Sequence, residues 1–476
     1  MNITTAAFTS MLAALALLSA GCMVGPKYQR PEVAASQPWP AGAARGVTPG
    51  EPVVEEWWKS FRDPELESLV VRALESNLDL KLAVARVEEA RANRGVARSG
   101  LAPQVNAGAS VVRQRQVLFG LPFGPLPYES TLYQTQFDMS WEADVFGRIR
   151  SQVRAATADL AAQQDDSRNV WIILVGDVGA NYAQLRGYQL RLVIADRNIG
   201  IQKDTLDLTR ALAAAGQATE RDVAQAEAQL ESTRANVPQL ETGREAAIHR
   251  LSVLLGSEPR ALAEELSRTA PLPEAPPAVP VGLPSELLER RPDIRRSEAQ
   301  LVAASARVGE AKAEYFPRFS LTGSAGREST QLHLLALGLG NAFSFGPSIS
   351  VPLFTAGRIR SNVAIQEARV KEAEAVYRST VLIAMEETEN ALVSYSNEQE
   401  RRDRLQRVIQ ADRTALELAQ VQYRAGIADF LTVLDAERTL SQNEDELAQS
   451  RTSVVISLIS LYKALGGGWP DAPLTR

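Results

Sequence analysis

Two segments of the chain alternate between apolar and polar residues. From Tyr133 to Trp141 one set of positions holds mainly apolar residues and the other holds Gln, Asp and Ser, and residues 343–353 repeat the alternation with Phe, Ile, Val and Leu against mainly Ser and Gly. A period of two places each set on its own face of a β-strand. Shorter alternations precede these segments at 105–111 and 319–325. The pattern therefore predicts two β-hairpins, with turns at 121–127 and 327–340.

A different period flanks the hairpins. Between Glu65 and Ser99 apolar residues recur at three- and four-residue spacing, which indicates an amphipathic helix, and residues 285–315 repeat that pattern. Asp63 followed by Pro64 is a typical helix start, because Asp accepts hydrogen bonds from the first free N–H groups and proline is tolerated at the first helical position.

After each hairpin the sequence is helical over an unusual length. Residues 147–215 and 357–425 hold almost no proline, and a return helix is predicted after each of them, at 219–255 and 429–465. A continuous helix of the first length extends for roughly 100 Å, against an ordinary helix of about 11–12 residues. Helices this long require partners along their length, so we expect coiled-coil-like packing.

The two halves of the chain form a tandem repeat. The sequence GRIRS at 147–151 recurs 210 residues later at 357–361, and Leu255-Gly256 recurs at the same offset as Leu465-Gly466. Upstream the offset is 214, so the first half carries four more residues between Pro103 and Gly147. A register held over so long a stretch indicates duplication rather than chance similarity of helices.

The repeat and the composition define six segments. We expect a signal peptide, a lipid anchor with an extended N-terminal arm, a first repeat, a Pro-rich linker, a second repeat and a C-terminal tail; in that order they cover residues 1–21, 22–62, 63–269, 270–284, 285–466 and 467–476. The linker holds six prolines, which favour extended backbone and make it a rigid connector.

The N-terminus has the features of a secreted lipoprotein. A short apolar run ends in small residues before Cys22, as in a signal peptide, although no Lys or Arg precedes that cysteine. Residues 18–22 (LSAGC) resemble a bacterial lipobox in which Cys22 is lipidated, except that Ser19 stands where the pattern has leucine. Met23 rather than Asp follows, which fits delivery to the outer membrane. The alternative is a small buried thiol in an uncleaved segment.

Composition narrows the function further. The 476 residues carry a net charge of −6, so there is no basic excess to bind nucleic acid. One cysteine permits no intramolecular disulfide, and two histidines exclude a His-rich metal site. No phosphate loop, nucleophile elbow or Cys/His cluster is present, so we expect neither an enzyme nor a bound cofactor or metal, apart from the covalent lipid.

The hairpins themselves suggest a membrane protein. A transmembrane strand faces lipid on one side and water on the other. A single hairpin of this kind would nevertheless favour a soluble sheet with one face on a core. Two matched hairpins on a secreted lipoprotein favour the membrane. Four strands cannot close a barrel, and an eight-stranded barrel is filled by its own side chains. Three chains give twelve strands and an open lumen, so a conduit requires a homotrimer.

Several motifs resemble the OprM/NodT branch of the TolC-like outer-membrane efflux proteins. They lie throughout the mature chain, at residues 22–31, 57–64, 289–294, 313–323, 346–354 and 423–436. The resemblance implies an α+β membrane protein: a long antiparallel α-helical barrel joined to a four-stranded contribution to a trimeric twelve-stranded β-barrel. It also implies an outer-membrane exit duct, lipid-anchored with a long periplasmic extension, that works with a periplasmic adaptor and an inner-membrane RND pump. Its substrates are not predicted.

The resemblance further implies a periplasmic aperture at the turns between long and return helices. Asp435 occupies the aperture-aspartate position in the second repeat, and Asp222 has a comparable place in the first; the alternative for each is helix capping. Tyr423 and Arg221 match positions that tether the closed state. Thr432 stands where one related duct has a second aspartate. Three-fold symmetry would make each acid a ring that favours cations.

One rival interpretation accounts for part of the sequence. A lipid-tethered periplasmic coiled-coil adaptor without a pore shares the long helices and Cys22. It leaves unexplained the two alternating hairpins at matched positions.

Overall fold

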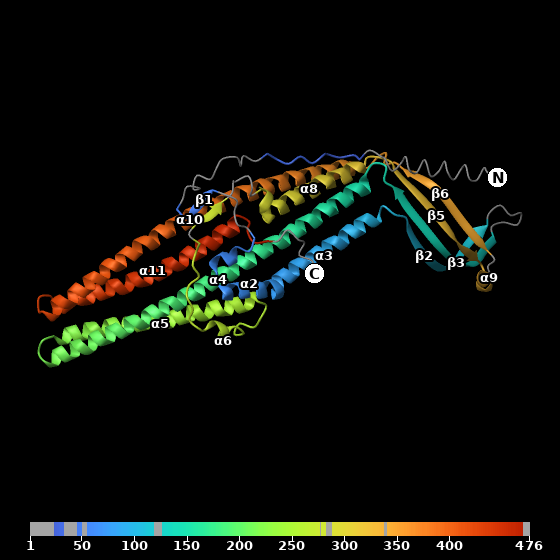
Figure 1. Cartoon of the computed structure of the whole chain (residues 1–476). Coiled ribbons are helices and arrows are strands. Elements are labelled where there is room, and N and C mark those ends of the chain that lie inside the picture. Colours follow the sequence, from blue (N-terminus) through green and yellow to red (C-terminus); the bar gives the residue numbers. More distant parts are fainter. Residues whose placement is uncertain are drawn as a thin grey trace. The chain divides into compact units, whose positions relative to one another are not determined.

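The computed structural model describes residues 23–32, 45–49, 55–118, 126–276, 278–281, 288–337 and 340–469. The predicted signal peptide and Cys22 lie outside the described residues. The chain forms two compact units, each built from parts of both repeats. One unit contains the strands that form the hairpins together with the starts of the two long helices, and the other contains the rest of the long helices with their return helices (Figure 1).

The first unit is built on a four-stranded sheet in the order β2-β3-β5-β6. Its strands are β2 (Gln104–Leu118), β3 (Leu126–Ala143), β5 (Arg318–Ser329) and β6 (Asn341–Ser350). All three pairings are antiparallel, and β3 of the first repeat pairs with β5 of the second. The four predicted strands and two hairpins are confirmed. A short helix, α9 (Leu332–Ala336), lies between β5 and β6.

The sheet register places the apolar residues of the predicted alternations on one face of all four strands. Ala107 is opposite Phe137, Phe137 is opposite Ala325, and Ala325 is opposite Phe343. The neighbouring positions form the other face, where Gln136 donates to Asp138 at 2.9 Å. The predicted separation of apolar and polar residues is therefore continuous across the repeat boundary.

Two strand boundaries differ from the prediction. The strand predicted for residues 343–353 ends at Ser350 in β6, so the apolar residues of 351–353 are outside the sheet. Its partner β5 begins at Arg318, which is opposite Ser350, so residues beyond 350 have no strand to pair with. In the first repeat β2 and β3 extend well beyond the predicted alternation, with pairing from Gln104–Ser140 to Leu118–Leu126.

The predicted long and return helices are confirmed. Helices α4 (Arg148–Ala214) and α10 (Arg358–Arg424) have 67 residues each, and α5 (Glu220–Leu254) and α11 (Phe430–Ala464) have 35 each. Each long helix and its return helix form one antiparallel hairpin, drawn in green for the first repeat and orange to red for the second (Figure 1). Pro238 lies inside α5.

The single helices predicted before each β-hairpin are interrupted. In the first repeat α2 (Pro64–Ser76) and α3 (Leu78–Ser99) are separated at Asn77. The buried Asn77 side chain accepts from Leu80 N and donates to the carbonyl of Leu254 at the end of α5, 2.9 Å each. The break is therefore a helix cap that also satisfies a neighbouring helix end.

In the second repeat a different residue hydrogen-bonds the end of the return helix. Arg291 precedes α8 (Pro292–Ala313) and lies 214 residues after Asn77. Its Nη1 donates to the carbonyl of Ala464 at 3.0 Å, and Nη2 pairs with Asp293 and Glu387. The Ala464 carbonyl is the counterpart of Leu254, so both return helices end on a side chain from the same place in their repeats.

Helices α4 and α11 pack antiparallel in the helical unit, and this α4–α11 interface has two parts. In the first part, glycines of α4 allow α11 to approach closely. A Cβ added at Gly176 would lie 3.3 Å from Lys463 Cδ, and one added at Gly179 would lie 3.2 Å from Ile459 Cδ1. Gly187 lies against Thr452. The second part is polar. Its contacts pair Arg191 with Asp445, Arg197 with Glu444, Asn198 with Ser441 and Thr205 with Glu437.

Smaller elements complete the helical unit. The strands β1 (Val47–Pro49) and β4 (Val279–Val281) pair in parallel, and a 3-10 helix, η2 (Trp57–Phe61), precedes α2, while α6 (Ala263–Leu266) follows α5. Trp57 is buried and stacks on Tyr462 of α11, with ring centroids 5.3 Å apart. Among the described residues, no helix has the length and apolar content needed to cross a membrane.

Candidate functional site

The candidate site comprises turn 1 (215–219), between α4 and α5, and turn 2 (425–429), between α10 and α11. Gly216 and Gly426 adopt positive φ angles of 74° and 71°, which glycine reaches without strain. After each glycine the next N–H bonds back to the last helical turn, from Gln217 to Leu212 and from Ile427 to Gln422. Both long helices thus end in the same glycine-dependent motif, which fixes where each return helix starts.

The two return helices start with the same pair of residue types in exchanged order. Thr219 caps α5 and Asp222 follows three residues later; the Asp222 carboxylate accepts from Thr219 N and Oγ1 at 2.9 and 2.8 Å. Asp429 caps α11 and accepts from Thr432 N and Oγ1 at 3.2 and 2.8 Å. Each turn therefore carries one carboxylate that is used for capping.

Asp222 is thus placed in a capping box. The hydrogen bonds from Thr219 lower the pKa of its carboxyl, with a smaller contribution from the Arg221 guanidinium. Arg221 Nε lies 3.9 Å from the Asp222 carboxylate, while three quarters of its own side chain is exposed. The structure gives both residues a local partner, and their roles in an aperture and a tether stay predictions.

Asp435 has a different environment. Its side chain is 64% exposed on the first turns of α11 and pairs with Arg438, three residues on, at 2.8 Å. It takes no part in capping, because Asp429 fills that place. An exposed carboxylate beside a hairpin turn can face an aqueous opening. The assignment of Asp435 to the aperture is compatible with this geometry and stays a prediction.

Tyr423 connects the two repeats near the turns. Its ring centroid lies 5.7 Å from that of Phe430, and the ring packs on an apolar cluster to which α4, α5 and α11 contribute. In the described part of the chain its buried hydroxyl has no hydrogen-bond partner. Burial raises the pKa of the Tyr423 phenol, and the nearby Asp222 carboxylate adds to that rise. The Asp222 carboxylate of one repeat thus acts electrostatically on Tyr423 of the other, but no hydrogen bond joins them among the described residues, and the tether role of Tyr423 stays a prediction.

Two acidic residues at this site were not singled out from the sequence. Asp429 was recognisable as a helix cap, because it directly precedes an apolar helical run. The sequence does not indicate that Glu437 is buried. Its counterpart 210 residues earlier is the same residue type, Glu227, which is exposed and paired with Arg210. Glu437 is instead 5% exposed against α4. Only the packing of one repeat on the other distinguishes the two glutamates.

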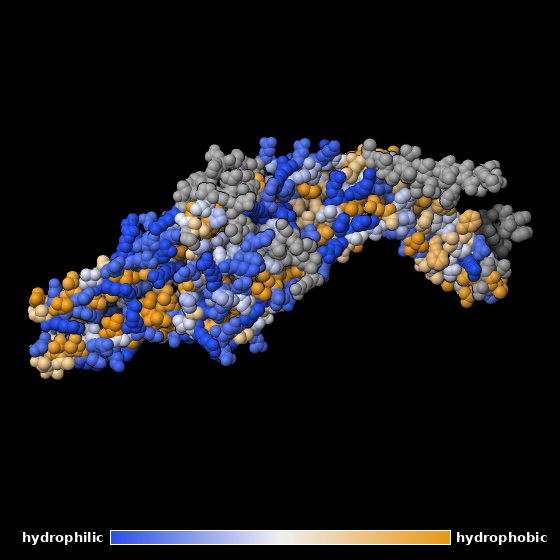
Figure 2. Space-filling model, viewed as in Figure 1, coloured by the Kyte–Doolittle hydropathy of each residue, from blue (hydrophilic) through white to orange (hydrophobic). Residues whose placement is uncertain are grey.

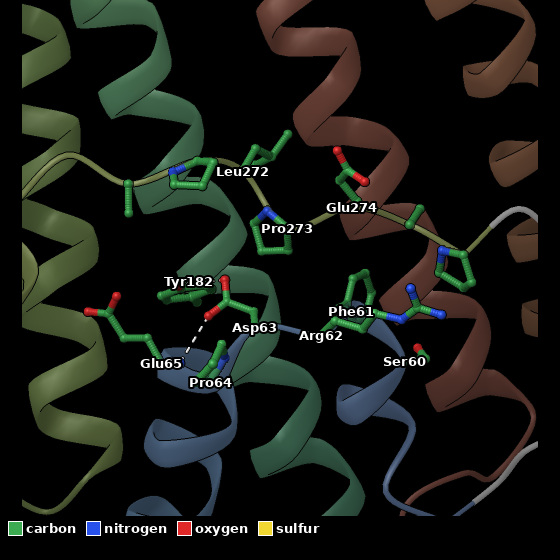
Figure 3. Close-up of a pocket in the computed structure, with 14 residues that line it drawn as sticks. Ser60, Phe61, Arg62, Asp63, Pro64, Glu65, Tyr182, Leu272, Pro273 and Glu274 are labelled. Atoms are coloured by element: carbon green, nitrogen blue, oxygen red, sulfur yellow. Dashed lines mark hydrogen bonds between the residues drawn. The ribbon is translucent and has the colours of Figure 1, made fainter.

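A cavity of about 750 Å³ lies away from turns 1 and 2 in the helical unit. Residues 60–65, Tyr182 and the linker segment 270–276 line it, and Leu272, Pro273 and Glu274 pass over Asp63 (Figure 3). The Asp63 carboxylate accepts from Glu65 N, Leu66 N and the Tyr182 hydroxyl, at 2.9–3.1 Å. Asp63 is therefore used by the protein itself, and the turns remain the stronger candidate.

The lipidation residue Cys22 lies outside the described residues, but the segment after it is described. Val24 N donates to the Phe146 carbonyl at 3.2 Å, between the end of β3 and the start of α4. Met23 packs so closely on Gly147 that a Cβ there would lie 3.1 Å from the Met23 Cα. Gly25 similarly touches Gly309. The first residues after Cys22 are thus fixed at a junction of strand and helix. Within the described ranges, no group of acidic, His or Cys side chains is suited to hold a metal ion.

Comparison with known proteins gives consistent matches over nearly the whole chain. The sequence model of the outer membrane efflux protein family matches residues 69–257 and 283–467. The solvent efflux pump outer membrane protein SrpC of Pseudomonas putida is 35% identical over 462 residues, covering 95% of this chain and 97% of SrpC. Outer membrane protein OprJ of Pseudomonas aeruginosa is 34% identical over 459 residues, covering 96% and 95%.

Solved structures match equally well. The outer-membrane channel OprN superposes with a TM-score of 0.88 at 38% identity, over 94% of this chain and all of that one. The open state of the MtrE outer membrane channel of Neisseria gonorrhoeae gives a TM-score of 0.80 at 30% identity, over 95% of this chain and all of MtrE. The fold is that of the TolC-like proteins to which the sequence motifs point.

Proposed function

The chain belongs to the outer membrane efflux protein family, and from that premise we propose that it is the outer-membrane exit duct of a tripartite efflux pump. It conducts small molecules passively from the periplasm to the exterior. Its partners are a periplasmic adaptor and an inner-membrane pump of the RND class. The names of its relatives, which are outer-membrane components of solvent and other efflux pumps, support this assignment.

The observation that carries the proposal is the apolar face of the four-stranded sheet. Phe343 is 86% exposed on that face, and Phe137 and Phe345 are at least 60% exposed. Figure 2 shows hydrophobic residues gathered over the strands labelled in Figure 1. A contiguous aromatic and aliphatic surface of this kind is unfavourable in water and requires a covering. Lipid supplies that covering at no cost to the polar face.

The ends of the sheet support assembly. In the order β2-β3-β5-β6 the outer strands β2 and β6 each pair on one side only. Unpaired strand edges cannot remain in lipid, because each free N–H and C=O costs several kcal/mol there. Three chains joined edge to edge give a closed twelve-stranded barrel with a lumen. We therefore propose a homotrimer.

A covalent lipid on Cys22 agrees with the packing next to it. Met23, Val24 and Gly25 are held where β3 ends and α4 begins. If the strands span the outer membrane, this junction lies at its periplasmic boundary, where an acyl chain can enter the inner leaflet. Replacement of Cys22 by Ser, with mass analysis of the mature N-terminus, tests the anchor.

The closed duct is proposed to narrow at turns 1 and 2. Asp435 and Asp222 would line the aperture, and Tyr423 and Arg221 would hold it closed. The exposure of Asp435 and the electrostatic effect of Asp222 on Tyr423 support these roles.

Membrane fractionation separates this proposal from the rival adaptor. The duct predicts heat-modifiable migration on detergent gels and recovery in the outer membrane even when Cys22 is replaced, because its strands are embedded. A lipid-tethered adaptor would become soluble in the periplasm once Cys22 is replaced, and that result would refute the duct.

A further inference from the structure

Glu437 is the one acidic residue of the polar part of the α4–α11 interface whose partners are all neutral. Its Oε1 accepts from the Thr205 hydroxyl of α4 at 2.9 Å, and the nearby Gln420 amide of α10 partly offsets the rise of its pKa. Its Oε2 is buried without a partner in the described part of the chain. A buried carboxylate that lacks a charged partner is strongly disfavoured, so this group resists ionisation where it lies.

Glu444, two turns further along α11, has the arginine partners that Glu437 lacks. Glu444 is as buried as Glu437, at 5% exposure each, but Arg197 and Arg413 both bind its carboxylate. Glu444 can therefore remain charged in the interface. Around Glu437 the α4 face consists of Asn198, Gln202, Thr205 and Thr209, all uncharged, at helical spacing.

A second orphan oxygen lies on the opposing helix. Gln202 Oε1, one turn before Thr205 on α4, is buried and also lacks a hydrogen-bond partner in the described residues. With both oxygens unpaired, the interface has more hydrogen-bond acceptors than donors. A proton on Glu437 Oε2 would convert one acceptor into a donor and relieve that shortage.

The charged and titratable groups of the surrounding elements do not alter this conclusion. They comprise Arg197, Lys203, Asp204, Asp207 and Arg210 on α4, Arg221, Asp222 and Glu227 on α5, Arg413, Glu417, Tyr423 and Arg424 on α10, and Asp435, Arg438 and Glu444 on α11. Among the described residues none of them forms an ion pair with Glu437, whose pKa is raised chiefly by burial. Most of their side chains are exposed, while Glu437 is not.

We propose that Glu437 is a proton-controlled latch in the α4–α11 interface: when it is protonated the two helical hairpins stay packed near turns 1 and 2, and its ionisation favours their separation. The glycine-lined part at Gly176, Gly179 and Gly187 contacts Lys463, Ile459 and Thr452 but no acidic side chain, so we take it as the fixed end. The sign follows from the burial. A raised pKa means that packing binds a proton, so packing is strongest at low pH and weakens as pH rises through that pKa.

The latch is tested by distance measurement between spin labels at Gln217→Cys in turn 1 and Ile427→Cys in turn 2, both exposed sites. Full-length labelled chain is diluted with unlabelled chain in lipid nanodiscs, at about pH 5 and about pH 8, which bracket a raised carboxyl pKa. We expect one short distance at low pH and a growing longer population at high pH. The ratio changes by at most about tenfold per pH unit, as for a single proton. The readout is a distance, so it succeeds or fails independently of transport.

Three variants decide the outcome. Glu437→Gln, a neutral analogue of the protonated form, should keep the short distance at both pH values. Glu227→Gln, at the matching position of the first repeat, should respond to pH as the unaltered chain does, because Glu227 is exposed and paired with Arg210. Thr205→Val removes one donor to the carboxylate and should move the transition to higher pH. A wild-type distance that does not change with pH, or a Glu437→Gln variant that responds like wild type, would overturn the proposal.

Discussion

Gly187 offers a quantitative test of how closely α4 and α11 pack. A Cβ at this position would lie 2.8 Å from Thr452 Cγ2 and 3.1 Å from Thr452 Cβ. Rotation of the threonine would sacrifice its hydrogen bond to the Ala448 carbonyl and would leave the Cβ contact in place. Gly187→Ala therefore forces the two helices apart, which costs about 1–3 kcal/mol as overpacking.

Helix propensity opposes this cost. Alanine is about 0.8–1 kcal/mol more favourable than glycine inside a helix, so the net change for Gly187→Ala is a destabilisation of about 0–2 kcal/mol. Gly200 on the same helix provides the matched control, because a Cβ there would meet nothing within 4 Å. Gly200→Ala should stabilise by about the full propensity gain of 1 kcal/mol.

Denaturant midpoints measured at one protein and detergent concentration give the comparison, since assembly makes apparent stability concentration-dependent. Adding Thr452→Ala removes the Cγ2 contact and should recover part of the loss caused by Gly187→Ala, with a coupling of about 1–2 kcal/mol between the two sites. If Gly187→Ala were as stabilising as Gly200→Ala, the close approach of α4 and α11 would be wrong.

Two further predictions concern the turns. Thr219→Ala removes the cap of α5 and should lower the free energy of unfolding by about 1 kcal/mol, measured from denaturant midpoints. Because the pKa of the Asp222 carboxyl is lowered, its capping contribution is present above the ordinary pKa of an aspartate and is lost as pH falls through the lowered value. An Asp222→Asn variant should lack that loss of stability in acid. Tyr423→Phe should leave stability unchanged, because the hydroxyl has no partner among the described residues. If the hydroxyl tethers the closed duct instead through a neighbouring chain, the same variant will show a larger resting ion current.

Elements with a strong period were predictable from the sequence. The four strands follow from alternation, and the long helices and their return helices follow from helical spacing, helped in the two long helices by the absence of proline. The break at Asn77 was not predictable, because apolar spacing continues across it and its cause is a carbonyl at the end of α5, distant in sequence. The strand end at Ser350 was missed because the apolar alternation outlasts the hydrogen-bonded ladder.

The candidate site divides in the same way. Turns 1 and 2 were located by their glycines and by the repeat, and the capping alternative weighed for Asp222 describes its observed contacts. What the sequence lacks is information on which copy of a repeated residue is buried. Glu227 and Glu437 occupy equivalent positions, and only the contact of α11 with α4 makes one exposed and the other buried.

The most direct test of the duct is single-channel conductance of the purified protein in a planar bilayer, for wild type, Asp435→Ala and Asp207→Ala. Asp207 is the matched control, an exposed aspartate paired with an arginine three residues on, as Asp435 is. We predict a small cation-preferring conductance that loses preference or grows in Asp435→Ala and is unchanged in Asp207→Ala. An equal response of the two variants would contradict the aperture assignment, and folded protein without channel activity would contradict the duct.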